Sequence, residues 1–200
     1  MRPATLYANL LVSAEALLRM LGFALATGII FARFSRPAAR IMFSAFAVVT
    51  RLDGKPTFMF RVSTECAIRI LDTHVTLTLA RNEATQEGVN KRRFHDLKVA
   101  RSYAPLFVMS RSVLHAIEAL HTIDESSPLH GATPDSLASE EAQIVATIVG
   151  IDDTLSHTIH ARFAYGASDI LFGRRLADIL TGGKGPTPVV DYSRFQDTVR

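Results

Sequence analysis

The stretch "IIFARFSRPAAR", residues 29–40, joins two parts of the chain that differ sharply in composition. A long apolar run ends at Phe31, and three arginines then follow within eight residues: Arg33, Arg36 and Arg40. Pro37 stops any helix that reaches it, because proline lacks an amide proton and its ring clashes with the preceding turn. We therefore expect a helix before this junction and a different kind of structure after it.

The part before the junction is almost free of charge. Between Pro3 and Ala32 the only charged residues are Glu15 and Arg19. A helix of this length would measure ~45 Å at 1.5 Å per residue, which exceeds the ~30 Å core of a bilayer. Glu15 and Arg19 stand four residues apart, so on a helix they share a face and can form an ion pair. Residues 1–34 are predicted to form one transmembrane helix.

Two interpretations of this start compete. A membrane helix would place its basic C-terminal flank in the cytoplasm by the positive-inside rule. A signal peptide would instead use Arg2 as its basic start and Ala24-Leu25-Ala26 as its cleavage site. Arg19 interrupts the apolar core that a signal peptide needs, and basic residues crowd the region after the cut. Composition favours the membrane helix, while a secreted or membrane-anchored immunoglobulin-like binding module remains the alternative.

Composition excludes several classes of protein. The chain has 200 residues, 48% of them hydrophobic and 20% charged, which is sufficient for one packed domain and one extra segment. The formal charge of +3 is mild, so we expect no nucleic-acid partner. Cys66 is the only cysteine, which excludes an intramolecular disulfide and a cage of thiolate metal ligands.

After Pro37 the pattern is that of strands. Residues 43–62 contain two apolar runs around Asp53-Gly54, a hairpin signal. Residues 67–80 alternate, so that Val75, Leu77 and Leu79 face opposite to His74, Thr76 and Thr78. Further strand-like runs are residues 96–102, 104–110, 142–149, 157–165 and 187–195. Residues 133–142 are expected to hold one short helix with Thr133 as N-cap. This pattern predicts a mainly β chain with a β-sandwich.

No set of residues makes a convincing enzyme site. His157 and His160 lie in a β-branched segment, where an odd separation sends them to opposite faces. His115, Glu118 and His121 have helical spacing, but we interpret them as solvated residues of a loop or helix. Ser126 and Ser127 lack the G-x-S-x-G surroundings of a nucleophile. We predict neither enzymatic activity, nor a metal site, nor a bound cofactor.

Eight strings occur in the order found in one family of channels. They are residues 22–44, 53–62, 95–102, 105–115, 122–131, 150–165, 168–179 and 189–198. With them the chain resembles the prokaryotic inward rectifier potassium channels. The resemblance implies an inner pore helix at 1–34, a basic linker at 35–42 and a cytoplasmic immunoglobulin-like β-sandwich at 43–200. It also implies a homotetramer in the cell membrane that transports potassium.

Several features depart from that family. The outer helix and the T-V-G-Y-G filter of the family would precede Met1, so the resemblance implies an N-terminally truncated subunit or a misplaced start. Selective conduction has no physical basis without filter carbonyls. Arg19 stands where the family is thought to use a glycine bend, Arg111 replaces a tryptophan, and six residues around 116–121 are inserted.

The resemblance also implies functional residues. Asp72 would face the cytoplasmic pore, where a ring of acids concentrates cations and holds polyamines or magnesium as blockers. Phe31 would form an apolar gate, Phe23 would occupy the rectification position, and Gly150 would begin a loop, up to Ser156, that narrows the vestibule. Arg33, Arg36 and Arg40 would bind anionic lipids at the membrane surface. Potassium enters this hypothesis as the permeant ion.

Overall fold

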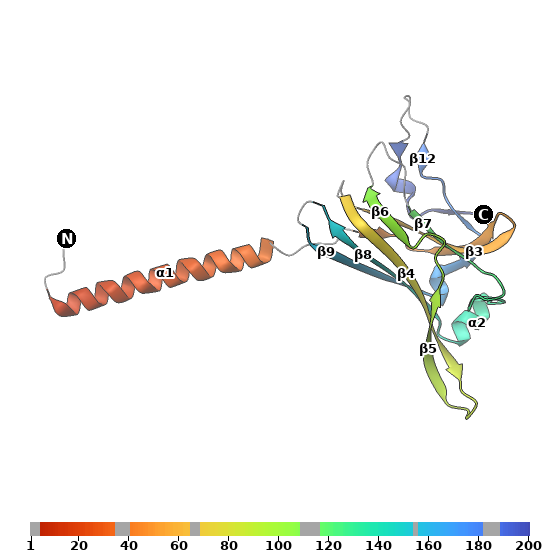
Figure 1. Cartoon of the computed structure of the whole chain (residues 1–200), viewed down its shortest axis with the longest axis horizontal. Helices are drawn as coiled ribbons and strands as arrows, with labels where there is room; N and C mark the ends of the chain where they lie inside the picture. The colour runs from red at the N-terminus through yellow and green to blue at the C-terminus, as the bar shows by residue number, and fades with distance from the viewer. Residues whose placement is uncertain (1–4, 35–40, 65–68, 109–116, 154–155, 182–188) are drawn as a thin grey trace. The chain divides into compact units, whose positions relative to one another are not determined.

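The structure is a computed structural model that describes residues 5–34, 41–64, 69–108, 117–153, 156–181 and 189–200. It contains two compact units, Met1–Ala38 and Ala39–Arg200, and Figure 1 shows the elements of each. Cys66 and His115 lie outside the described residues.

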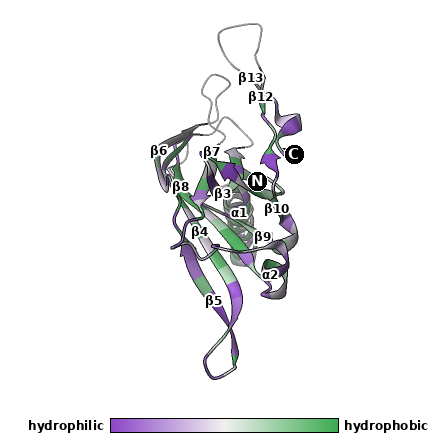
Figure 2. Cartoon of the chain, turned by 90° about the vertical axis from the view of Figure 1, so that its right-hand side faces the viewer, coloured by the Kyte–Doolittle hydropathy of each residue, from purple (hydrophilic) through white to green (hydrophobic). Residues whose placement is uncertain are grey.

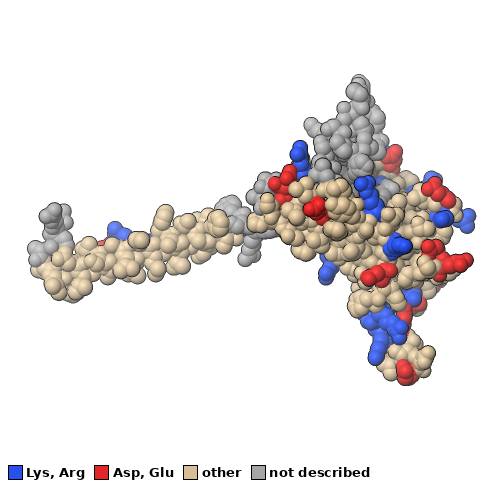
Figure 3. Space-filling model, in the orientation of Figure 1, with Lys and Arg blue, Asp and Glu red and all other residues tan. Residues whose placement is uncertain are grey.

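The first unit contains the helix α1 (Leu6–Phe34). Its 29 residues correspond to the predicted apolar segment, and it is long and apolar enough over Leu6–Arg33 to cross a membrane. The other described residues bury no part of the most apolar stretch of this helix, and Figure 3 shows only isolated charges along it. Those charges include Glu15 and Arg19, whose side chains form the predicted ion pair. The expected long apolar helix is therefore confirmed.

The second unit contains two five-stranded sheets. The strands of the first sheet follow the order β1 (Ile41–Phe43), β3 (Lys55–Thr64), β2 (Ala47–Leu52) and β10 (Ile170–Phe172). A fifth strand, β7 (Ile117–Thr122), also pairs with β3. The strands of the second sheet follow the order β5 (Asn90–Leu97), β4 (Arg69–Ala84), β8 (Gln143–Asp152) and β9 (Thr158–Gly166). A fifth strand, β6 (Tyr103–Val108), also pairs with β4.

Short elements complete the unit. They are α2 (Pro134–Ser139), the 3-10 turns η1 (Ala167–Asp169) and η2 (Tyr192–Arg194), the pair β11 (Arg175–Leu176) with β14 (Thr198–Val199), and the pair β12 (Leu180–Thr181) with β13 (Val189–Val190). Figure 1 also shows the β4–β5 hairpin extending beyond the rest of the two sheets.

One apolar core lies between the two sheets. Phe58 and Phe60 of β3 are fully buried, and the ring of Phe60 lies 5.5 Å from that of Tyr165 on β9. Burial raises the pKa of the Tyr165 hydroxyl above its usual range. Val75 on β4 is buried, while the adjacent His74 is exposed, as the alternation predicts. Figure 2 shows hydrophobic segments in the middle of the sheets and hydrophilic stretches along β5. The predicted β-sandwich is confirmed, and its immunoglobulin-like character stays a prediction.

Local signals account for two connections. Asp53 and Gly54, between β2 and β3, have φ values of 50° and 77°, as a two-residue hairpin turn requires. Thr133 caps α2: its side chain accepts from the Ser136 amide, and the Ser136 hydroxyl accepts from the Thr133 amide. Both predictions are confirmed.

Two strand predictions and one loop or helix prediction need correction. Strand β5 ends at Leu97, so residues 98–102 form a connection instead of a strand. Only Val189–Val190 of the run 187–195 is a described strand, because Asp191 accepts from the Ser193 amide and starts η2. Residues 117–122 form β7, although a loop or helix was expected there. Pairing with β3 along the whole length of β7 overrides the helical spacing of its residues.

Candidate functional site

Asp72 lies at an irregularity in the longest strand. The register between β4 and β8 shifts between Leu71 and His74, which is a β-bulge. Asp72 has a φ of 48°, a left-handed conformation that aspartate tolerates better than most residues, and its side chain is exposed. The bulge thus turns a carboxylate out of a sheet whose neighbouring residues Leu71 and Thr73 are half-buried and buried.

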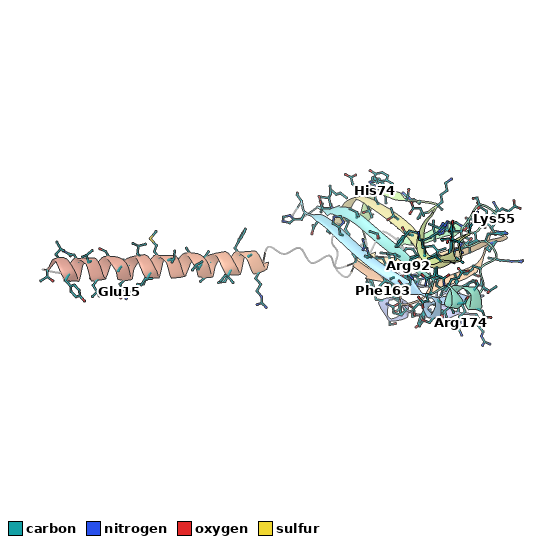
Figure 4. The ribbon with its side chains drawn as sticks, turned by 90° about the horizontal axis from the view of Figure 1, so that it is seen from below. Glu15, Lys55, His74, Arg92, Phe163 and Arg174 are labelled. Carbon is teal, nitrogen blue, oxygen red and sulfur yellow. The ribbon has the colours of Figure 1, made fainter. Side chains whose placement is uncertain are left out.

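Tyr103 holds this carboxylate in place. Strand β6 pairs with β4, and the Tyr103 hydroxyl donates a hydrogen bond of 3.0 Å to Asp72 Oδ1. This bond to a carboxylate raises the pKa of Tyr103 above its usual value. The Tyr103 ring lies 5.0 Å from the ring of His74, which projects from the surface of the sandwich in Figure 4. Tyr103 was missed in the sequence, because only the pairing of β6 with β4 brings it to Asp72.

Gly150 lies directly behind the bulge. A loop was predicted to begin at Gly150, but this residue lies within strand β8 (Gln143–Asp152). A Cβ at this position would lie 2.4 Å from Ile70 Cγ2, 3.1 Å from the Leu71 carbonyl oxygen and 3.2 Å from Thr73 Oγ1. Only glycine allows β8 to approach the bulge this closely. The loop that was predicted to narrow the vestibule, up to Ser156, includes residues 154–155, which lie outside the described residues.

The two phenylalanines of the predicted pore both lie on α1. Phe23 and Phe31 are 77% and 72% exposed, so no other described residue covers them. They stand eight residues apart, which separates them by ~80° around the helix axis. Arg19 is four residues before Phe23 and shares its face.

The basic junction is described in part. Arg33 is the basic residue in the last turn of α1, where a cation interacts favourably with the helix dipole. Arg36 and Arg40 lie outside the described residues.

His121 is buried, although a solvated position was expected. Its Nδ1 lies 2.9 Å from the Lys98 carbonyl oxygen, so this nitrogen carries the proton and donates. In the neutral ring, Nε2 accepts from the Ser127 hydroxyl at 2.7 Å, and Ser127 is buried as well. The pair connects β7 to the segments on either side, which is a structural role. Within the described ranges no group of three or more His, Cys, Asp or Glu side chains could hold a metal ion.

The sandwich carries the sequence pattern of a known channel domain. Residues 41–200 match the family described as the inward rectifier potassium channel C-terminal domain. The chain belongs to the inward rectifier potassium channel family.

Relatives in this family extend the match into α1. The chain is 36% identical over 190 residues to the inward rectifier potassium channel Kirbac3.1 of Paramagnetospirillum magnetotacticum, which covers 95% of this chain and 62% of that protein. It is 34% identical over 180 residues to human inward rectifier potassium channel 4, or 86% of this chain and 38% of that one. It is 31% identical over 199 residues to human inward rectifier potassium channel 18, a match that covers 96% of this chain and 45% of that protein.

These inward rectifiers are ion channels by name, which agrees with the resemblance found in the sequence. The chain spans less than two thirds of the length of each of them. The family match covers the whole sandwich, including the bulge at Asp72, and a match to 96% of the chain must include most of α1.

Proposed function

We propose that this chain is a subunit of an inward rectifier potassium channel, in which α1 lines the membrane pore and the sandwich forms part of a cytoplasmic vestibule. The observation that carries the proposal is the Asp72 carboxylate, which a left-handed bulge and the Tyr103 hydroxyl hold toward solvent in a domain of this family. Four copies around one axis would assemble the pore, with potassium as the permeant ion and the sandwich in the cytoplasm.

Four copies of Asp72 would have a clear electrostatic effect. A ring of like charges around a water-filled axis raises the local concentration of cations, and a flexible polycation can contact several carboxylates at once. Polyamines or magnesium held there would hinder outward flow of potassium. On α1, Phe31 would narrow the cytoplasmic end as an apolar constriction that closes by dewetting. Phe23 offers no charge to a blocker, so we expect weak rectification.

The junction would anchor the subunit to anionic lipids. Each basic residue near an anionic surface contributes about 1 kcal/mol, so Arg33, Arg36 and Arg40 together provide substantial attraction. The alternative of a secreted immunoglobulin-like binding module is not favoured, because the relatives that match this chain are channels.

Spermine-dependent assembly tests this proposal. The full chain, purified in detergent, should form tetramers by light scattering, and spermine should increase the tetramer fraction by bridging the carboxylates. Asp72→Asn should respond several-fold less to spermine. Asp53→Asn is the matched control, because Asp53 is also exposed and has nearly the same φ of 50°. Asparagine tolerates this conformation, so both variants remove one charge without backbone strain.

The control separates two failures. Identical spermine responses in the Asp72 and Asp53 variants would remove Asp72 from the cation site while leaving the channel assignment intact. A chain that stays monomeric under every condition would contradict its role as a pore-forming subunit.

A further inference from the structure

A cavity opens in the sandwich beside α2, and it shares no residue with the site around Asp72. Its volume is about 270 Å³. Phe58 and Ile170 contribute to it from the first sheet, Ile144 from the second sheet, and Leu137 from α2. These four side chains are buried, so they form its floor. Figure 1 places α2 next to the sandwich at this end.

The lining of this cavity is apolar. Among the residues that line it, His130 is the only one with a polar side chain, and no acidic or cationic side chain of the described residues takes part. His130 and Pro56 are exposed, so both lie at the rim. Moving a charged group from water into such surroundings without a partner is strongly unfavourable. The chemistry of the walls therefore selects an uncharged ligand, whose polar atom would lie at the rim.

The volume limits the size of the ligand. An apolar cavity of ~150 Å³ in a protein holds one benzene molecule, whereas drug-sized ligands use pockets of roughly 300–1,000 Å³. The cavity at α2 falls between these limits and cannot admit a helix or a strand, since a helix with its side chains is about 10 Å wide. A molecule with one or two fused rings matches this volume.

We infer that this cavity is a binding site for a small uncharged molecule with an apolar body of one or two rings. The body lies between the two sheets, against Phe58, Ile144 and Leu137, and any polar atom faces His130 and water. Because the ligand contacts both sheets and α2 only in the folded sandwich, binding stabilises the fold. This inference does not depend on the proposed role of Asp72.

Indole is a suitable probe because the chain contains no tryptophan. Its fluorescence can be excited selectively in the full chain held in lipid nanodiscs, with matched empty nanodiscs subtracted. Indole should bind saturably, its emission should shift to shorter wavelength, and the Tm of the sandwich should rise. Tryptamine and indole-3-acetate carry the same two rings with a positive or a negative charge, and we expect each to bind at least tenfold more weakly.

Filling the cavity provides the decisive variant. Ala132 lines the cavity and is half-buried, so Ala132→Leu should reduce indole binding at least tenfold and remove the rise in Tm. Ala138→Leu makes the same change at an exposed position of α2 and should bind indole like the wild type. Ile123→Phe fills the cavity from another segment and replaces the first variant if that one does not fold.

Three outcomes would overturn the inference. They are the absence of saturable indole binding to the wild type, equal binding by the wild type and the filled variants, and equal or tighter binding of a charged congener. The last two results would place the indole in the lipid or at another surface of the protein.

Discussion

At the scale of single residues, Gly150 and Asp72 depend on each other. The bulge turns Asp72 outward, and this backbone shape exists because β8 can approach it at Gly150. An added methyl group would meet both a side chain and the backbone at the bulge, since Ile70 Cγ2 and the Leu71 carbonyl oxygen lie within 3.1 Å of it. The glycine therefore acts through packing, and its effect on any cation site is indirect.

Gly150→Ala should destabilise the sandwich by about 1–3 kcal/mol, the usual range for overpacking a core. Chemical denaturation of the full chain measures the change in the free energy of unfolding. Gly166→Ala is the matched control, because the nearest atom to its added Cβ lies 3.5 Å away, an ordinary contact. Equal stability of the two variants would show that β8 does not approach the bulge as closely as described.

At the scale of elements, β4 changes character along its length. Up to Leu79 it contributes Val75, Leu77 and Leu79 to the core, and beyond Ala80 the same face carries the charged side chains of Arg81 and Glu83. There the Glu83 carboxylate lies 2.8 Å from Arg81 Nε, 2.6 Å from His95 Nε2 and 3.6 Å from Arg93 Nε. Charged side chains gather over this part of the surface in Figure 3. The ion pair of Glu83 with Arg93 and its hydrogen bond with His95 therefore connect the two strands where the core ends.

This charge cluster predicts a pH dependence of stability. Hydrogen bonds from Arg81 and His95 lower the pKa of Glu83 below its usual value of 4.5. The ionised carboxylate therefore stabilises the fold at pH values above 4.5, and this contribution is lost as the pH falls through the lowered pKa. Arg93 faces the same carboxylate, and Glu140 contacts Arg81 at 3.5 Å.

Glu83→Gln should weaken the dependence of the unfolding free energy on pH between about pH 5 and 3. The cluster is partly solvated, so the difference should stay below about 1 kcal/mol. Denaturation curves at several pH values measure it, with Glu125→Gln as an exposed control outside the cluster. A Glu83 variant with the same acid dependence as the wild type would refute the stabilising role of this carboxylate.

At the scale of the whole molecule, the chain combines an apolar helix with a charged sandwich through one basic junction. The two parts suit different surroundings, because the large apolar side chains of α1 are exposed, as Figure 4 shows along the helix, while those of the sandwich form a buried core. A bilayer core would surround the apolar helix, and the lipid anchor proposed above would place the arginines at the anionic surface of that bilayer.

Changing Arg33, Arg36 and Arg40 together to glutamine should reduce binding of anionic lipid, and the loss should shrink as salt rises. Native mass spectrometry of the full chain in micelles with added phosphatidylserine would count the bound lipids. Changing Lys91, Arg92 and Arg93 of β5 to glutamine removes the same charge from an exposed strand and serves as control. Equal lipid binding by both triple variants at low salt would exclude the junction as the binding region.

Much of this architecture could be predicted without coordinates. The apolar helix, the Asp53-Gly54 hairpin, the alternation of β4 and the Thr133 cap all depend on residues close together in the chain. Such signals act through the periodicity of side chains and the conformations allowed to Gly, Pro, Asp and Thr, which hold in any fold.

Other features depend on partners far away in the chain. The spacing of residues 117–122 suited a helix, yet these residues pair with β3 as a strand. In this strand His121 is buried and forms hydrogen bonds with the Lys98 carbonyl and the Ser127 side chain. The pairing of β6 with β4 brings Tyr103 to Asp72, and Gly150 matters only because β8 passes behind the bulge. The cavity beside α2 likewise forms where two sheets and a helix meet. Contacts between distant segments depend on strand register and layer packing, for which a local stretch of sequence carries no signal.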